Sequence, residues 1–122
     1  MTRQTETGSA GEAFVAGRLE RSGYRILDRN WRVRGGELDL VTLDGETLVF
    51  VEVKVRSGGS YTAADDSLDW RQLNRLMVAA ERYIQLHEEH YDRVWRVDLV
   101  AVTLSSAGTV LRCNHYQNLT EE

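Results

Sequence analysis

The 122-residue sequence has no proline, one cysteine, one lysine and no long hydrophobic run. The single cysteine, Cys113, cannot form an internal disulfide, and no His and Cys residues have the spacing of a structural zinc site. The apolar runs are far shorter than the roughly 20 residues that cross a membrane. The polar N-terminal sequence MTRQTETGSAGE lacks the hydrophobic stretch of a signal peptide. We therefore expect a cytoplasmic protein with no membrane partner.

Positive charge is also scarce. The formal net charge is −4 and the pI about 5.4, which excludes a protein that coats nucleic acid through bulk positive charge. Any contact with a polyanion must be local. Lys54 is the only lysine among 15 basic residues, which leaves 14 (15 − 1) arginines. With 42% hydrophobic residues the chain can build a modest core, and its length suits one domain over residues 1–122.

Hydrophobic spacing and glycine-rich turns divide the chain into helices and strands. A capping box at Ser9 and Glu12 opens the first helix, and Gly23 ends it as a left-handed cap. Apolar residues at helical spacing predict a second helix over about 68–87. Strand-like runs cover residues 24–27, 31–34, 38–43, 47–56, 94–104 and 109–115. This order predicts an α/β fold, with a mixed sheet and helices packed against it.

The most informative segment is a predicted hairpin with Asp44-Gly45 as its turn. A two-residue turn there pairs residues whose numbers sum to 89, so we expect Glu37 opposite Glu52 and Asp39 diagonal to Glu52. Because side chains alternate along a strand, one face of the hairpin collects the charged residues Glu37, Asp39, Glu52 and Lys54. The other face, which we expect to be buried, collects Leu38, Leu40, Val49, Val51 and Val53.

Three acids and one ammonium group suit divalent-metal catalysis. Carboxylates, waters and a backbone carbonyl such as that of Val53 form the oxygen octahedron that Mg²⁺ or Mn²⁺ prefers. The ion activates a water for attack on a phosphodiester, and Lys54 can stabilise the developing charge. A solvated strand face with cross-strand ion pairs would show the same alternation, so the residues alone leave both interpretations open. Repulsion between facing acids and the apolar flanking sequence favour the metal site.

Several motifs, in order, resemble those of the YraN-type bacterial family, namely Glu12, Gly36-Glu37-Leu38-Asp39-Leu40-Val41 and Phe50-Val51-Glu52-Val53-Lys54-Val55-Arg56. That family is similar to archaeal Holliday-junction resolvases of the restriction-endonuclease-like, PD-(D/E)xK superfamily. The resemblance covers nearly the whole chain. It implies a restriction-endonuclease-like mixed β-sheet flanked by α-helices, with Asp39 as the first aspartate, Glu52 and Lys54 as the E-x-K pair and Glu12 as a helix-borne acid. The implied activity is divalent-metal-dependent cleavage of DNA, with branched or recombination intermediates as candidate substrates.

Further residues are candidates for substrate contact. Arg34 and Arg56 lie near the acidic cluster in the sequence and could guide a phosphate backbone, and Tyr61, in a polar loop, could stack on a base. A solvated basic edge and a flexible loop are the simpler interpretations of these residues. Glu37 is a further candidate in the site, and Glu12 has the capping box as its local alternative.

One position departs from the family pattern. Gln72 stands where we expect a basic residue early in the second helix, although Arg71 or Arg75 could replace a phosphate contact. The alternative function is therefore a non-catalytic nucleic-acid-binding or protein-interaction module on the same scaffold. Cleavage of a four-way junction at symmetric positions would imply a homodimer. Core or partly buried positions are expected for the tryptophans Trp31, Trp70 and Trp95.

Overall fold

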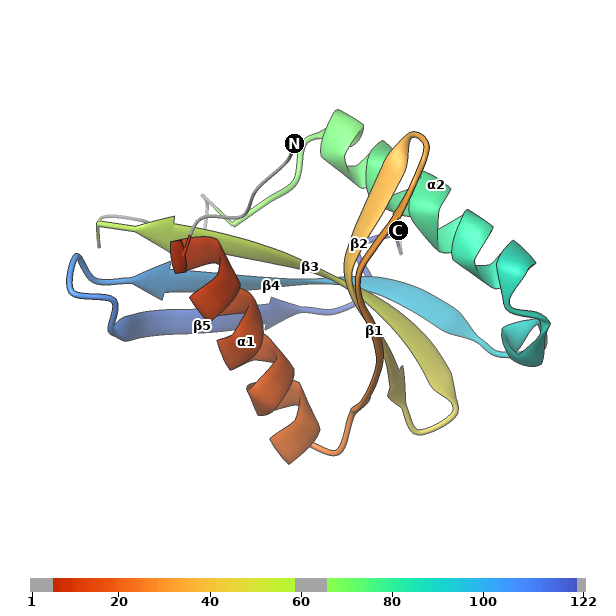
Figure 1. The fold of residues 1–122 in the computed structure, drawn as a ribbon, viewed down its shortest axis with the longest axis horizontal. Helices are drawn as coiled ribbons and strands as arrows, with labels where there is room; N and C mark the ends of the chain where they lie inside the picture. The colour runs from red at the N-terminus through yellow and green to blue at the C-terminus, as the bar shows by residue number, and fades with distance from the viewer. Residues whose placement is uncertain (1–5, 59–65, 121–122) are drawn as a thin grey trace.

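A computed structural model describes residues 6–58 and 66–120, which form one five-stranded sheet and two long helices (Figure 1). The elements are α1 (Glu6–Arg21), β1 (Arg25–Val33), β2 (Gly36–Asp44), β3 (Thr47–Ser57), α2 (Trp70–Leu86), the 3-10 turn η2 (Glu88–His90), β4 (Trp95–Leu104) and β5 (Val110–Tyr116). The strands lie in the order β1-β2-β3-β4-β5, and only the β3–β4 pair is parallel. The predicted α/β fold, a mixed sheet flanked by helices, is confirmed. Within the described residues, neither helix combines the length and apolarity of a membrane crossing.

Both faces of the sheet are covered by a helix. The α2 face is filled by Leu38, Val41, Leu43, Leu48, Phe50, Leu76, Ala79, Ala80, Tyr83 and Val97. The α1 face is filled by Val15, Ala16, Leu19, Leu40, Val49, Val51, Val100, Val102 and Leu104. The parallel strands β3 and β4 therefore bury side chains on both sides, which explains their nearly continuous apolar runs.

Helix α1 differs from the prediction at its start. The chain is already helical at Glu6, so Ser9 lies inside α1 and the predicted capping box is wrong. No residue just before Ser9 stops a helix, because a single glycine such as Gly8 is tolerated inside one at a cost of about 1 kcal/mol. The predicted end is confirmed: Gly23 has φ +96°, and the Tyr24 N–H donates to a carbonyl of the last turn.

The β2–β3 hairpin turns one residue later than predicted. Its pairs Asp44–Thr47 and Leu40–Val51 sum to 91 instead of 89, so the two turn residues are Gly45-Glu46. Gly45 has φ +62°, which suits the first central position of a two-residue hairpin turn of the II′ type. The sequence dipeptide Asp-Gly located the turn correctly but not the strand register.

The shifted register changes which acids face each other. Continued beyond its last pair, it places Asp39 in line with Glu52, because 39 + 52 is also 91. The predicted pairing of Glu37 with Glu52 is wrong. Glu37 instead pairs across β1–β2 with Arg32, whose Nε donates to Glu37 Oε2 at 2.5 Å.

The predicted buried face of β2 is also wrong at one residue. Leu38 packs on the α2 face and Leu40 on the α1 face, so the regular alternation is interrupted between them. Asn30, which the β1–β2 register places opposite Asp39, has φ +50°. Strand β1 nevertheless continues through this point and joins the two short extended pieces that the sequence predicted. The irregular position in the hairpin is thus the position of the candidate aspartate.

Gly36 allows the β1–β2 hairpin to approach α2 closely. A Cβ atom on Gly36 would lie 2.4 Å from the carbonyl oxygen of Arg75 and 2.9 Å from the Cβ of Ala79. In Figure 1 the hairpin rises out of the sheet beside the first half of α2. This approach brings the start of β2 and the first turns of α2 to the two sides of one pocket, described below.

Candidate active site

The candidate site begins where β2 and β3 separate. Their regular pairing ends at Leu40–Val51, so the N–H of Val53 has no partner on β2's backbone. The Asp39 carboxylate takes that place, and Val53 N–H donates to Asp39 Oδ2 at 2.8 Å. Asp39 is only 8% exposed. A side chain therefore replaces the strand backbone at this fork, and it fixes the carboxylate beside β3.

Asp39 and Glu52 form a hydrogen-bonded pair of carboxyl groups. Burial is the main cause that raises both pKa values, and for Glu52 the negative charges of Asp39, Glu37 and Glu12 raise the pKa further, to about 9. The pair consequently shares a proton at neutral pH. A bound cation would favour its removal, so the pair is a place where positive charge is stabilised.

Glu12 approaches the pair from α1. A Cβ on the preceding residue, Gly11, would lie 2.4 Å from a methyl carbon of Val55, so this part of α1 lies directly against β3. Glu12 is half-buried, and its charge acts on Glu52. Within residues 6–58 and 66–120, however, no three His, Cys, Asp or Glu side chains are grouped closely enough to hold a metal ion.

Lys54 lies on the same side of β3 as Glu52. Val53 and Val55 pack on the α1 face, which leaves Glu52 and Lys54 on the α2 face. The prediction that these two residues share a face is confirmed. The Lys54 ammonium donates a hydrogen bond to the carbonyl oxygen of Ser67, in the segment that leads into α2. Sequence reasoning did not identify Ser67, because a backbone carbonyl leaves no signature in side-chain identity.

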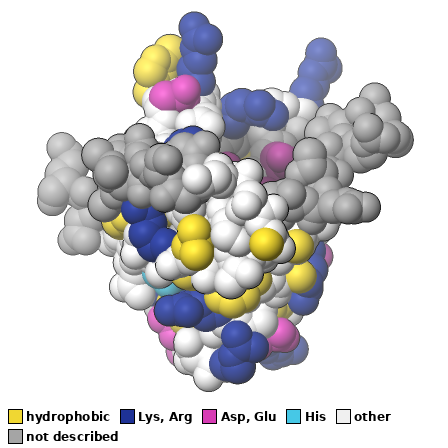
Figure 2. Space-filling view, turned by 90° about the vertical axis from the view of Figure 1, so that its left-hand side faces the viewer, with side chains coloured by type: hydrophobic (Ala, Val, Ile, Leu, Met, Phe, Trp, Pro, Cys, Tyr) yellow, Lys and Arg dark blue, Asp and Glu magenta, His cyan; other side chains and the backbone are white. Residues whose placement is uncertain are grey.

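A pocket of about 130 Å³ opens between the hairpin and α2. It is lined by Glu37, Glu52, Gln72, Arg75 and Leu76. Two acids thus face one guanidinium and one amide across a space that a phosphate group or a few waters could fill. In the view of Figure 2, acidic side chains lie recessed below projecting Lys and Arg side chains.

The structure gives a local reason for Gln72. Its N–H donates to Asp69 Oδ1 at 2.8 Å, and its side-chain oxygen accepts from the Asp69 N–H at 2.9 Å, which completes a capping box for α2. A lysine at this position could not supply that acceptor. Arg75, one turn later, is the basic residue that lines the pocket.

The remaining predicted contact residues are spread around the site. Arg34 is exposed at the β1–β2 turn, and Arg56 is half-buried farther along β3 than Lys54. Tyr61 lies outside the described residues. Glu37 lines the pocket and is held by Arg32. The backbone N–H of Val53 donates to Asp39. The role of the Val53 carbonyl group as a metal ligand stays a prediction.

Trp70 contradicts the prediction of a packed tryptophan. It is 74% exposed at the first position of α2, and the Arg71 guanidinium carbon lies 5.6 Å from the centroid of its ring. The apolar stripe of α2 begins only at Leu73, so Trp70 precedes the buried face. Trp31 and Trp95 are half-buried against the α2 core, as expected.

Comparisons with known proteins identify relatives along most of the chain. A family model described as "Uncharacterised protein family UPF0102" matches residues 11–102. A UPF0102 protein from Beutenbergia cavernae is 42% identical over 120 residues, which cover 98% of this chain and 99% of that protein. A UPF0102 protein from Stutzerimonas stutzeri is 42% identical over 103 residues, covering 84% and 86% of the two chains. A third, from Pelotomaculum thermopropionicum, is 41% identical over 111 residues, which cover 91% of this chain and 92% of that protein.

Proposed function

This chain belongs to the Uncharacterised protein family UPF0102, and we propose, from the site that its residues form, that it is a divalent-metal-dependent nuclease acting on DNA. The expected YraN-type membership is confirmed at the level of this family. The relation to the restriction-endonuclease-like, PD-(D/E)xK superfamily and to Holliday-junction resolvases is part of the proposal. One observation carries it: the pair of the buried Asp39 and the half-buried Glu52 at the strand fork, with Lys54 on the same face of β3 as Glu52.

The donor set fits Mg²⁺ or Mn²⁺. Two carboxylates at one point, with a backbone carbonyl such as that of Val53 nearby, match ions that keep several waters and complete their shell with substrate phosphate. Glu12 would add a third carboxylate from α1. Such an ion would supply an activated water and neutralise charge on the phosphodiester.

The surrounding residues would bind and orient a phosphodiester. Lys54 would hold the attacking water or stabilise the negative charge that develops on the phosphate. Arg75 lines the pocket, and Arg34 and Arg56 could contact neighbouring phosphates. Because the net charge is −4, these contacts have to be local. Each phosphate that they neutralise releases counterions, so affinity for DNA should fall as salt is added.

Cleavage assays on end-labelled DNA test the proposal directly. Linear duplex, single-stranded, flapped and four-way-junction substrates would be incubated in Mg²⁺ and in Mn²⁺. Asp39→Asn and Lys54→Ala should each abolish cleavage. Asp44→Asn, which changes a carboxylate at the far end of the same strand, is the control and should retain it. Full activity in Asp39→Asn or Lys54→Ala would contradict the assignment.

The second candidate is a binding module that keeps the scaffold without turnover. The net charge of −4 and Gln72 in place of a basic residue favour it. DNA binding without cleavage in either metal would support the binding module over the nuclease.

Junction cleavage would further imply a two-fold dimer, because the two cut sites are related by symmetry. Light scattering with and without DNA measures the oligomeric state.

A further inference from the structure

We propose that Asp66 is a positioning residue for Lys54 and that it acts through the carbonyl group of Ser67. The inference rests on the role proposed for Lys54, and it adds to that role a support on β5, at the far edge of the sheet. It starts from a buried carboxylate that the proposed reaction does not use.

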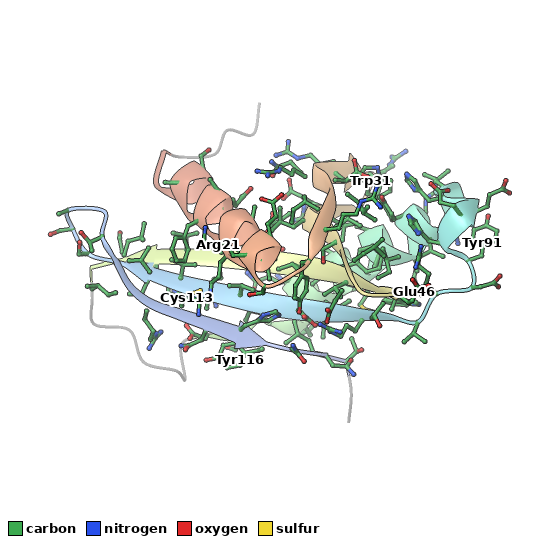
Figure 3. The ribbon with its side chains drawn as sticks, turned by 90° about the horizontal axis from the view of Figure 1, so that it is seen from below. Arg21, Trp31, Glu46, Tyr91, Cys113 and Tyr116 are labelled. Carbon is green, nitrogen blue, oxygen red and sulfur yellow. The ribbon has the colours of Figure 1, made fainter. Side chains whose placement is uncertain are left out.

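Asp66 is held by three side chains of one strand. Its carboxylate is 1% exposed and accepts from an Arg112 guanidinium nitrogen at 3.0 Å, from Asn114 Nδ2 at 3.2 Å and from the Tyr116 hydroxyl at 3.0 Å. The three donors alternate along β5 and therefore lie on one face of it. Figure 3 shows Tyr116 on β5, across the sheet from Trp31 on β1. The charge of Arg112 compensates the buried carboxylate.

A second anchor lies three residues farther along the chain. Asp69 caps α2, and its side chain and backbone both bond to Gln72. The Ser67 peptide is therefore held between a residue fixed to β5 and a residue fixed to α2. Its carbonyl group has little freedom to move, although Ser67 itself is exposed.

Lys54 donates to that carbonyl group. A lysine side chain is a flexible four-carbon stem, and a fixed acceptor restricts where its ammonium group lies. An ammonium group has three donors, so a bond to one carbonyl is compatible with further bonds to a phosphate or a water. The chain of contacts from β5 through Asp66 and Ser67 would thus hold the charge of Lys54 on the Glu52 side of β3.

The composition offers a direct readout, because Lys54 is the only lysine in the sequence. The rate of acetylation of Lys54 by an excess of acetic anhydride, measured by mass spectrometry at fixed pH, reports how firmly the amine is held. The α-amino group of the same chain is the internal reference. Asp66→Asn should raise the Lys54 rate about fivefold relative to that reference, the change expected when a hydrogen bond of typical net strength is lost.

Two milder variants, matched to each other, control for the chance that Asp66→Asn misfolds. Tyr116→Phe removes one hydroxyl that bonds to Asp66. Tyr24→Phe removes one hydroxyl that accepts from Arg96, which also donates to Asp44 and Asp98, and it leaves Lys54's surroundings intact. Tyr116→Phe should raise the Lys54 labelling rate in the same direction as Asp66→Asn, and Tyr24→Phe should not change it.

The cleavage assay provides the second readout. Asp66→Asn should lower kcat about tenfold with KM changed less than twofold, because misplaced catalytic groups slow the chemical step more than they weaken binding. Unchanged labelling in both Asp66→Asn and Tyr116→Phe would overturn the inference. Faster labelling with a raised kcat would also overturn it, since the Ser67 contact would then hold Lys54 away from the substrate. If the wild-type protein cleaves no DNA, the proposed function fails, and the labelling rates still decide whether Asp66 holds Lys54.

Discussion

Replacing Glu52 by glutamine should stabilise the metal-free protein, and the gain should grow with pH. Glutamine has nearly the shape of a protonated glutamate and can still donate a hydrogen bond to Asp39. The substitution therefore removes the ionisation of Glu52 and little else. In the wild-type protein that ionisation is opposed by burial and by the charges of Asp39, Glu37 and Glu12.

The size of the effect follows from the pKa. A glutamate side chain has an ordinary pKa of 4.5, and the fold raises the pKa of Glu52 to about 9. A raised carboxyl pKa means that the folded state binds the proton more tightly than the unfolded state. The free energy of unfolding therefore falls as pH rises from about 4.5 to about 9, by ~1.4 kcal/mol per unit. At pH 7 the wild-type protein should be roughly 3 kcal/mol less stable than Glu52→Gln, and near pH 4.5 the two should be equal.

Urea unfolding at pH 5 and pH 7.5, without divalent ions, measures this difference. The control Glu46→Gln changes a carboxylate that is 99% exposed, and it should stay within about 0.5 kcal/mol of the wild type at both pH values. Addition of Mn²⁺ at pH 7.5 should stabilise the wild type more than Glu52→Gln. A variant that is less stable than the wild type, or a difference that does not change with pH, would refute the reasoning.

Three further predictions concern other parts of the molecule. Gly36→Ala should lower stability by about 1–3 kcal/mol and reduce the melting temperature, because the added Cβ would meet the carbonyl oxygen of Arg75. Asp98→Asn should lower the free energy of unfolding by about 2–4 kcal/mol at pH 7, because Asp98 is fully buried and bonded to Arg96. The pKa of Asp98 is lowered, so the stability that its ionised form contributes is present at neutral pH and is lost on acidification below about pH 4. Unfolding measured as a function of pH would show this loss. Trp70→Ala should leave the melting temperature unchanged but weaken binding of single-stranded DNA roughly 5- to 100-fold in a fluorescence titration, if its exposed ring stacks on a base.

The element order and the face shared by Glu52 and Lys54 could be predicted from the sequence because both follow from local periodicity. Alternation fixes which side chains of β3 share a face, whatever the neighbouring strand does. The register between β2 and β3 could not be predicted in the same way. It depends on which two residues form the turn, and a shift of one position exchanged Glu37 for Asp39 as the neighbour of Glu52.

The rest of the site depends on contacts between distant segments. Asp66 is unremarkable in the sequence, and its role follows from three donors that lie 46–50 residues away on β5. Because tryptophan is usually buried, the sequence predicts a core or partly buried Trp70, but its position before the apolar stripe of α2 leaves it exposed. Gln72 stands where the resemblance to the YraN-type family leads us to expect a basic residue, and it has a structural reason in the cap of α2.

The bond between Asp39 and the Val53 amide has a consequence for the evolution of this fold. Asp39 closes a gap in the sheet as well as offering a carboxylate, so under the proposed function it would be selected both for stability and for cleavage. A lineage that abandoned cleavage would still lose stability by replacing Asp39, whereas Lys54, which fills no gap between strands, would be free to drift. Under the proposed function, a retained aspartate alone would indicate an intact sheet among descendants of this protein, whereas the aspartate retained together with the lysine would be the pattern expected of a nuclease.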